Sequence, residues 1–381
     1  MSTTSTIVIA GGYGLVGRLI AERLAPQFSV VLAGRDPDRA RAAAASIGHG
    51  VRAERLDASD PESVQALLRS TRPTLVVACA PKSERALAQG CLAAGVDYTD
   101  VSADFAGIAQ ADDLHELAVQ TGATAVLSVG IAPGLTNLLA RDACSLLDEV
   151  HRLDLGVRLH IADEHGAAAI EWTLENLAVP FDVVENGAIR SERPFIARRS
   201  LDFGGHSRVP GGGFNFPEQR TLARTLDIPT VRSWLAIEPA ILHGAAVAAA
   251  RSGTARILGS KSVRRPLVRA MGSLPQRQGG FAVCAEATGL RNGRRLVVAG
   301  HFAGHGEAAM TAEVAAHVAR RLTKKDQPHG VWHIEQLPDS GDLLTALASE
   351  AGSQARVTAN TASASSGRHT IRSGSDTSDW L

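Results

Sequence analysis

The sequence predicts an α/β protein, with an N-terminal doubly wound parallel sheet followed by a second α+β domain. Three observations predict this architecture. Short apolar runs alternate with helical patterns through the first third of the chain, as in successive β-α-β units. A glycine-rich turn joins the first apolar run to the first helical pattern. Beyond about residue 140 the apolar runs lengthen, and a turn signal joins two of them, which indicates antiparallel pairing.

The first domain is expected over residues 1–140. The second helix has clear start signals, because Asp36 suits its N-cap and Pro37 its first turn. Six strands with intervening helices complete a doubly wound unit. The expected strands are 7–10, 29–33, 52–56, 74–79, 97–101 and 123–129, and the marked helical segments are 18–24, 61–68 and 83–94.

The α+β domain is expected over residues 141–304. A long strand is predicted at 153–161, and two more at 281–288 and 295–302 flank Arg291-Asn292-Gly293, which is typical of a hairpin turn. In segment 305–352, a helix over 307–322 is expected to pack back on the first domain. The last segment, 353–381, is rich in Ser, Thr, Ala and Gly without periodicity, so it is predicted to be a disordered tail.

Charge and cysteine usage limit the partners and the compartment. Lysine plus arginine and aspartate plus glutamate number 39 each, so net charge predicts neither a nucleic-acid nor a membrane partner. The basic cluster of Lys261, Arg264 and Arg265 is interpreted as a solvated helix face. Four widely spaced cysteines without a C-x-x-C pair, and an N-terminus without a signal-peptide pattern, predict a cytoplasmic protein.

The first β-α turn carries the pattern G-x-G-x-x-G at Gly12, Gly14 and Gly17. In a strand–loop–helix context this pattern is typical of a Rossmann dinucleotide site, where the glycines permit a tight turn, close approach of the pyrophosphate and close helix packing. The intervening residues Tyr13, Leu15 and Val16 are therefore expected to contact the cofactor as well. The alternative spacing G-x-x-G-x-x-G, which begins at Gly11, resembles the short-chain dehydrogenase pattern, and spacing alone does not choose between the two.

The end of the second strand favours NADP over NAD. An NAD site needs a carboxylate there for the ribose 2′-hydroxyl, whereas this chain has Gly34 followed by Arg35. A guanidinium forms charge-assisted hydrogen bonds with a 2′-phosphate. Asp36 is the alternative acid, which keeps NAD possible, but its position before Pro37 favours helix capping.

Further cofactor contacts are expected at the ends of later strands. Asp57 follows the third strand, where it is predicted to lie near the adenine, with a simple loop acid as the alternative. Cys79, Ala80 and Pro81 end the fourth strand, at the edge where the nicotinamide half of the cofactor lies in such folds. We interpret Cys79 as a small buried residue rather than a nucleophile.

Several catalytic patterns are absent from the sequence. Neither Tyr13 nor Tyr98 is followed four residues later by lysine, so the proton-transfer pair of short-chain dehydrogenases is missing. The chain has neither a G-x-S-x-G nucleophile elbow nor an H-E-x-x-H motif. We therefore predict no metal site.

Longer motifs make the chain similar to the saccharopine dehydrogenase-like family, in particular its reductase branch. The resemblance rests on the glycine loop, on the C-x-x-A-G-x-x-Y-x-D pattern of residues 91–100, and on Pro133-Gly134-Leu135-Thr136-Asn137. It covers residues 6–140 well and 280–350 in patches, with similar segments at 163–166, 311–312 and 330–335. The Gly- and Arg-rich middle of the chain matches poorly.

The resemblance implies an NADP-linked Rossmann domain, a substrate and dimerisation domain, and hydride transfer at a carbon that carries nitrogen. Such a reaction needs a positioned hydride acceptor and one proton for the nitrogen. By location, Tyr98 and Asp100 are candidates to donate that proton or fix substrate, unless Tyr98 packs in the core. His165 is the second-domain acid–base candidate.

The loop after the sixth strand provides the last candidates for the cofactor site. Pro133 and Gly134 are expected to open a helix beside the nicotinamide. Asn137 is expected either to bind the carboxamide or to satisfy the start of the helix.

The function predicted from the sequence is therefore an NADP-dependent oxidoreductase. Its substrate would be a small metabolite containing an imine or secondary amine, and its expected assembly is a homodimer. Two alternatives remain, namely a non-catalytic NADP-binding redox sensor and a ketone, enone or quinone reductase.

Overall fold

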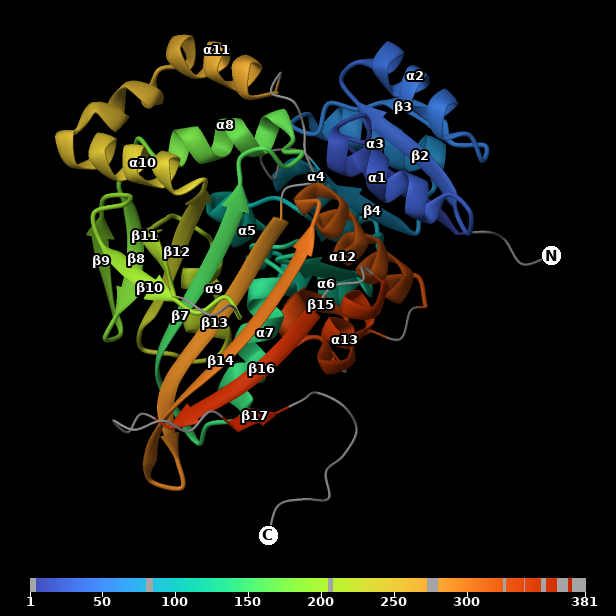
Figure 1. Ribbon diagram of the computed structural model, residues 1–381. Coiled ribbons are helices and arrows are strands. Elements are labelled where there is room, and N and C mark those ends of the chain that lie inside the picture. Colours follow the sequence, from blue (N-terminus) through green and yellow to red (C-terminus); the bar gives the residue numbers. More distant parts are fainter. Residues whose placement is uncertain are drawn as a thin grey trace.

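The computed structural model of the chain describes residues 5–79, 85–204, 208–272, 280–324, 327–338, 340–350, 354–361 and 369–371. Within these residues, two sheets organise the molecule, and α7 and α12 lie close to both (Figure 1). The predicted fold class is confirmed, with a parallel sheet in the N-terminal part and a mixed sheet after it.

The first sheet is formed by seven described strands, all parallel, in the order β15-β6-β5-β4-β1-β2-β3. Its central strands are buried on both faces and rich in Val, Ile, Leu and Ala, as a sheet covered by helices requires. The strands are β1 Thr6–Ala10, β2 Ser29–Gly34, β3 Arg52–Arg55, β4 Leu75–Ala78, β5 Asp97–Asp100, β6 Thr124–Leu127 and β15 Gly330–His333.

The helices of the first domain connect these strands. Asp36 caps α2 as predicted, because its Oδ1 accepts hydrogen bonds from the amides of Asp38 and Arg39, each at 3.1 Å. The helices are α1 Leu15–Leu24, α2 Pro37–Ile47, α3 Pro61–Thr71, α4 Arg85–Ala93, α5 Phe105–Asp112, α6 His115–Thr121 and α7 Leu135–Ser145.

The second sheet has ten strands among the described residues. Its main path runs β10-β11-β12-β7-β13-β14-β16-β17, with β8 and β9 attached at β12. The predicted hairpin is confirmed, since β13 and β14 pair antiparallel along their full length. The strands are β7 Glu149–His160, β8 Phe181–Glu185, β9 Ala188–Glu192, β10 Arg198–Leu201, β11 Val209–Gly213, β12 Val231–Glu238, β13 Gly280–Arg291, β14 Arg294–His305, β16 Gln354–Thr361 and β17 His369–Ile371.

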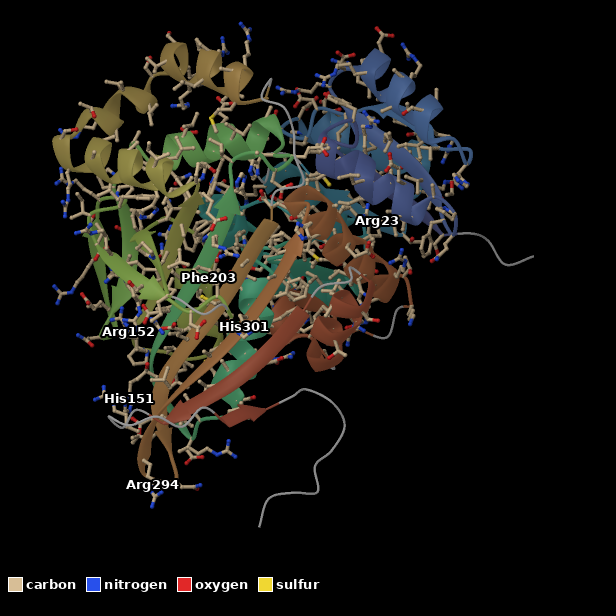
Figure 2. All side chains as sticks on the ribbon, viewed as in Figure 1. Arg23, His151, Arg152, Phe203, Arg294 and His301 are labelled. Carbon is tan, nitrogen blue, oxygen red and sulfur yellow. The ribbon has the colours of Figure 1, made fainter. Side chains whose placement is uncertain are left out.

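The remaining helices cover the second sheet or return to the first domain. Helix α12 packs against α1, where the Arg23 Nε donates to Glu313 at 2.6 Å (Figure 2). These elements are α8 Ala167–Asn176, α9 Glu218–Thr225, α10 Ala240–Ser252, η1 Thr254–Gly259, α11 Lys261–Gly272, α12 Glu307–Leu322, η2 Ile334–Gln336 and α13 Ser340–Glu350.

Two features of the C-terminal segment differ from the prediction. Strand β15 joins the first sheet beside β6, whereas the sequence predicted six strands there. The tail prediction is wrong for residues 354–361 and 369–371, because β16 pairs with the edge of β14, and β17 pairs with β16. Backbone pairing with an open sheet edge orders a segment that lacks an apolar pattern.

One hydrophobic cluster joins the two parts of the molecule. It extends from Ile7 and Ile9 on β1 to Leu153 on β7 and Phe281 on β13. Helix α7, which follows β6, packs directly on β13 and β14. The second sheet therefore lies close to the end of β6, where cofactor contacts were predicted.

Candidate functional site

Two glycines of the first β-α turn have no room for a side chain. A Cβ atom on Gly12 would lie 2.8 Å from the carbonyl oxygen of Ile9 and equally close to the Leu32 side chain. A Cβ on Gly17 would lie 2.8 Å from the carbonyl oxygen of Gly11. The turn is therefore packed backbone against backbone, which fits the tight turn predicted at Gly12 and the close helix packing predicted at Gly17.

Helix α1 begins at Leu15 with an end suited to an anion. The first amides of a helix have no intrahelical acceptor, and Gly14, at the N-cap, has no side chain to supply one. The first turn, which includes Val16 and Gly17, contains no acidic side chain. Free N–H groups and the positive end of the helix dipole together favour a phosphate.

Tyr13 occupies the space where an NAD-specific acid would be placed. A Cβ on Gly34 would overlap the Tyr13 ring, so any side chain at position 34 is excluded while the ring stays there. The Arg39 guanidinium lies over the same ring, 4.7 Å from its centroid. Steric overlap with the Tyr13 ring therefore explains the glycine at position 34. The segment that follows it carries two guanidinium groups, those of Arg35 and Arg39.

Asp57 lies just after β3, and its carboxylate is stabilised by hydrogen bonds from the neighbouring Ser59. The Ser59 hydroxyl donates to its carboxylate at 2.7 Å and the Ser59 amide at 3.2 Å. These two hydrogen bonds, with smaller contributions from the charges of Arg35 and Arg55, lower the pKa of Asp57. This geometry fits the loop-acid interpretation, and the predicted adenine contact stays a prediction.

Cys79 directly follows β4 and is half-buried. Burial, followed by the nearby charge of Asp100, raises the pKa of the Cys79 thiol far above its ordinary value, so this group stays protonated. The structure thus agrees with a small buried residue rather than a nucleophile. Ala80 and Pro81 lie outside the described residues.

Tyr98 and Asp100 form a closed pair on β5. Tyr98 is fully buried, and its hydroxyl donates to Asp100 at 2.9 Å. Asp100 also accepts the Ser102 amide at 2.7 Å. Burial and the Asp100 carboxylate raise the pKa of Tyr98 well above its ordinary value. The core interpretation of Tyr98 therefore holds, and the predicted proton donation by Tyr98 or Asp100 does not fit this arrangement.

The loop after β6 leads into α7 through Pro133 and Gly134, as predicted. Gly134 has a φ of 140°, and a Cβ there would overlap the backbone of Gly130. Asn137 is fully buried, its Oδ1 accepting the Gly134 amide at 3.0 Å and its Nδ2 donating to Glu335 at 2.9 Å. Of the two predicted roles for Asn137, the structure shows the one at the helix start, and binding of a carboxamide does not fit.

His165 is held by two partners in front of α8. Its Nδ1 lies 2.5 Å from Glu307 Oε2, and its Nε2 lies 3.0 Å from the carbonyl oxygen of His160. Burial alone would lower the pKa of His165. The hydrogen bond and charge of Glu307, the His160 carbonyl and the charge of Asp163 outweigh burial and raise the pKa to about 9. His165 is therefore an imidazolium at neutral pH.

The His165 loop lies beside both the glycine loop and the first turn of α12. A Cβ on Gly166 would lie 4.0 Å from the Leu15 Cβ. At the start of α12, the Glu307 amide donates to Asp163 at 3.0 Å. One turn further, Thr311 lies 3.4 Å from the position of a Cβ on Gly130. The N-terminal turn of α12 therefore joins the His165 loop to the loop after β6.

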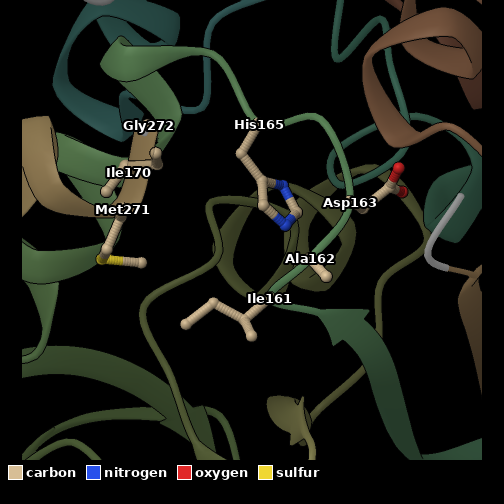
Figure 3. Close-up of a pocket in the computed structure, with 7 residues that line it drawn as sticks. All are labelled: Ile161, Ala162, Asp163, His165, Ile170, Met271 and Gly272. Atoms are coloured by element: carbon tan, nitrogen blue, oxygen red, sulfur yellow. The ribbon is translucent and has the colours of Figure 1, made fainter. Parts of the chain in front are cut away.

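A small cavity opens next to His165. In Figure 3 the imidazole lies between the side chains of Ile170 and Met271 on one side and Asp163 on the other. Helices α8 and α11 supply one wall, and the end of β7 supplies the other. Its lining residues are Ile161, Ala162, Asp163, His165, Ile170, Met271 and Gly272.

A second buried polar cluster lies where α9 meets α7 and η2. The Thr136 hydroxyl donates to Glu218 at 3.2 Å, and the Thr225 hydroxyl donates to Glu335 at 2.7 Å. Asn137 joins the two halves through Glu335. Burial raises the pKa of Glu218 to about 8, and the charge of Glu335 adds to the shift, while hydrogen bonds from Thr136 and its own amide oppose it. Glu218 is therefore largely neutral at pH 7.

Three residues of these sites were missed by the sequence analysis. Arg39 lies in the first turn of α2, four residues after Arg35, and this short distance in the sequence would have indicated it. Glu307 begins the helix predicted at 307–322, and an acid in a first turn is common, so no local signal marked it as the partner of His165. Glu218 lies in the middle segment, where the chain offered no motif.

Among the described residues, no cluster of three or more His, Cys, Asp or Glu side chains is arranged to bind a metal ion. Within the same part of the chain, no helix has both the length and the apolarity needed to cross a bilayer.

The fold and the glycine loop define a two-domain protein with a dinucleotide-binding domain at its N-terminus. Residues 7–126 match the model of the family described as saccharopine dehydrogenase NADP binding domain. The match covers the Rossmann part of the chain, and a domain of this family implies NAD(P) binding.

Comparison with solved structures supports the fold over nearly the whole chain. The chain is similar to an apo, histidine-tagged saccharopine dehydrogenase (L-Glu forming) from Saccharomyces cerevisiae, with a TM-score of 0.67 and 12% identity, covering 94% of this chain and 100% of that one. A short-chain type dehydrogenase/reductase from Mycobacterium ulcerans gives a TM-score of 0.27 at 18% identity, over 32% of this chain and 66% of that chain. Menthone neomenthol reductase from Mentha piperita gives 0.20 at 28%, over 22% and 33%. The last two likenesses are too small to bear on the fold or function.

Proposed function

We propose that this protein is an NADP-dependent oxidoreductase that transfers a hydride to or from a carbon bonded to nitrogen. The observation that carries the cofactor half of the proposal is the environment of Gly34. The Tyr13 ring fills the space of the missing acid, and Arg35 and Arg39 supply positive charge beside it. Guanidinium groups favour a 2′-phosphate over a 2′-hydroxyl.

The chain's own groups fit NADP in two places. The glycine turn and the first amides of α1 would hold the pyrophosphate, because a Cβ on Gly12 or Gly17 would meet backbone there. Arg35 and Arg39 would hold the 2′-phosphate. When bound, the nicotinamide supplies or accepts the hydride.

The second half of the reaction needs a proton for the substrate nitrogen. His165 is the best-supported donor, because it carries a proton at neutral pH and lines a cavity beside the loop that packs near Leu15. To donate that proton, His165 must exchange its contact with the His160 carbonyl for one with substrate. Glu307 would hold the ring in place during the exchange and stabilise its charge.

A specific observation favours a second candidate, a non-catalytic NADP-binding redox sensor. The polar groups of Tyr98 and Asn137 have protein partners, and both nitrogens of His165 are engaged. In this arrangement none of the three predicted side chains has a donor directed at a substrate. A protein that binds NADP without turning it over would have no need of one.

Turnover separates these candidates. The purified chain would be mixed with NADPH and screened, by loss of the nicotinamide absorbance, against imines formed from amines and carbonyl compounds, and against ketones, enones and quinones. The proposal predicts oxidation of NADPH with at least one imine-forming pair. Turnover with only ketones, enones or quinones would contradict the substrate class, and tight binding without turnover in every case would favour the sensor.

A further inference from the structure

Helix α10, the short helix η1 and helix α11, residues 240–272, form a basic arm along one edge of the molecule. In Figure 1, α10 and α11 form the upper left edge, and α8 lies beneath them. The arm contacts the rest of the chain on one side only, through α10 on β12 and α11 on α8. Neither the proposed cofactor site nor the proposed reaction uses its outer surface.

The arm is strongly asymmetric in charge. The sequence has no aspartate or glutamate between Glu238 and Glu286, although one residue in ten of the whole chain is acidic. The same stretch has seven basic residues, so 39 minus these seven leaves 32 basic against 39 acidic residues elsewhere. The seven are Arg251, Arg256, Lys261, Arg264, Arg265, Arg269 and Arg277. A neutral chain therefore concentrates its positive charge in one segment.

Among the six of these residues that the structure describes, all but one face solvent. Arg264 is only 2% exposed, and its guanidinium donates to the carbonyl oxygens of Leu258 at 2.8 Å and Gly259 at 2.6 Å. Arg264 thus connects α11 to η1, and its interpretation as part of a solvated face is wrong. The exposed basic residues of the arm are Arg251, Arg256, Lys261, Arg265 and Arg269.

Large apolar side chains are exposed on the same elements. Ile241 is 78% exposed, Ile257 61% and Leu267 39%. Val179, 42% exposed, lines a cavity at the base of the arm together with Arg256. These four are among seven exposed large apolar residues in the described part of the chain. Scattered single residues of this kind are ordinary, but three of these four belong to the same elements as the exposed basic residues, which favours an interaction surface.

We propose that the basic arm docks this protein on an anionic lipid surface. A bilayer rich in anionic lipid can bind both kinds of side chain on the arm. Its headgroups attract arginine and lysine, and its interface accepts isoleucine and leucine. This is a peripheral contact that needs no spanning helix. The proposal departs from the expectation, drawn from net charge alone, that the protein has no membrane partner, and that expectation stays a prediction.

Other occupants match the arm less well. In a symmetric pair of copies the same patch would face itself, so five exposed cations would meet without any carboxylate on the arm to neutralise them. A nucleic acid would pair with the arginines but would leave Ile241 and Ile257 in water. The lipid surface accounts for both kinds of residue.

Co-sedimentation of the full chain with vesicles tests the proposal. Vesicles of phosphatidylcholine alone would be compared with vesicles of equal parts phosphatidylcholine and phosphatidylglycerol. We expect binding to the mixed vesicles only. The double variant Arg265→Gln and Arg269→Gln should weaken that binding at least tenfold, because each basic residue near an anionic surface contributes about fivefold to the affinity. The pair Ile241→Ser and Ile257→Ser should also weaken it at least tenfold, because exposed isoleucines lose their apolar contact with the interface.

The matched control makes the same two kinds of change away from the arm. Ile189 on β9 is 71% exposed, and Arg294 lies at the far tip of the β13–β14 hairpin (Figure 2). Ile189→Ser with Arg294→Gln should leave vesicle binding unchanged. Far-UV circular dichroism checks folding of each variant, and single changes at Arg269 and Ile257 replace any pair that fails to fold, each with a several-fold loss expected.

Four results would overturn the proposal. The first is a wild-type chain that does not bind mixed vesicles, and the second is a control pair that weakens binding as much as the arm pairs do. Vesicle binding that the isoleucine pair leaves unchanged would show that the apolar side chains of the arm do not contact the lipid interface. A change in the sedimentation coefficient of the arm variants without vesicles would assign the arm to an interface between copies of the chain.

Discussion

Glutamine at position 218 should change how the stability of this protein depends on pH. Glu218 is fully buried, with the Thr136 hydroxyl donating to one carboxyl oxygen and no protein partner for the other. Its pKa rises from an ordinary 4.5 to about 8. The unfolded chain therefore loses this proton at lower pH than the folded protein does. Stability from Glu218 is fully present below pH 4.5 and is lost progressively as the pH rises to about 8.

The magnitude follows from the size of the shift. Each pKa unit corresponds to about 1.4 kcal/mol, so the shift to about 8 from 4.5 amounts to about 5 kcal/mol. Glutamine has nearly the same shape and cannot ionise, so Glu218→Gln should escape this loss. The glutamine amide costs about 1–3 kcal/mol of stability, because the atom that replaces Oε2 of Glu218 has no hydrogen-bond partner among the described residues. This cost does not vary with pH.

Thermal unfolding of both proteins between pH 5 and pH 9 measures the difference. Because the unfolding entropy is about 2.1 cal/mol/K per residue, a chain of 381 residues shifts by about 1 °C per kcal/mol, so the midpoint of the variant should rise relative to the wild type by about 5 °C across this range. Glu62→Gln, which changes an exposed carboxyl, is the control and should give a flat difference. If Glu218→Gln also gave a flat difference, the buried neutral carboxyl would be refuted.

Three further predictions concern the proposed cofactor and substrate sites. Gly17→Ala should abolish NADPH binding in a titration of nicotinamide fluorescence, because its Cβ meets the Gly11 backbone, whereas Gly244→Ala, which has open space, should bind normally. Tyr98→Phe should lose about 1.5–3 kcal/mol of stability by removing a buried hydrogen bond to a carboxylate, and a fall in turnover without a fall in melting temperature would contradict this structural role. The Glu307 partner raises the pKa of His165 to about 9, so its stabilisation is full below pH 6.5 and is lost as the pH rises through 9. His165→Gln should thus be most destabilised relative to wild type below pH 6.5, and a gap in melting temperature that widens above pH 9 would exclude the ion pair.

The sequence predicted the elements whose signals are local. The glycine turn, the Asp36 cap and the hairpin around Asn292 each depend on a few adjacent residues, and each forms as predicted. Strand β15 was missed because it has only four residues and pairs with residues of β6 that lie 206 positions earlier in the chain. Strand β16 was missed because edge pairing, rather than an apolar pattern, places it.

The partners of Tyr98 and Asn137 could not be predicted because they depend on tertiary packing. Sequence position placed Tyr98 near the proposed cleft, but it could not show that Asp100 accepts its proton within a closed core. Asn137 was correctly placed after β6, yet its partner Glu335 lies 198 residues away. Tertiary packing decides which side chains have hydrogen-bond partners, so the sequence alone does not show which donors can reach a substrate.

Binding of NADPH and NADH to the wild-type chain and to Arg35→Ala tests the central claim most directly. Calorimetric titration gives the two dissociation constants for each protein. The account predicts that the wild type prefers NADPH and that Arg35→Ala weakens NADPH at least tenfold while changing NADH little, since the lost charge-assisted hydrogen bonds are worth about 1.5–3 kcal/mol. Equal weakening of both cofactors, or a wild-type preference for NADH, would contradict it.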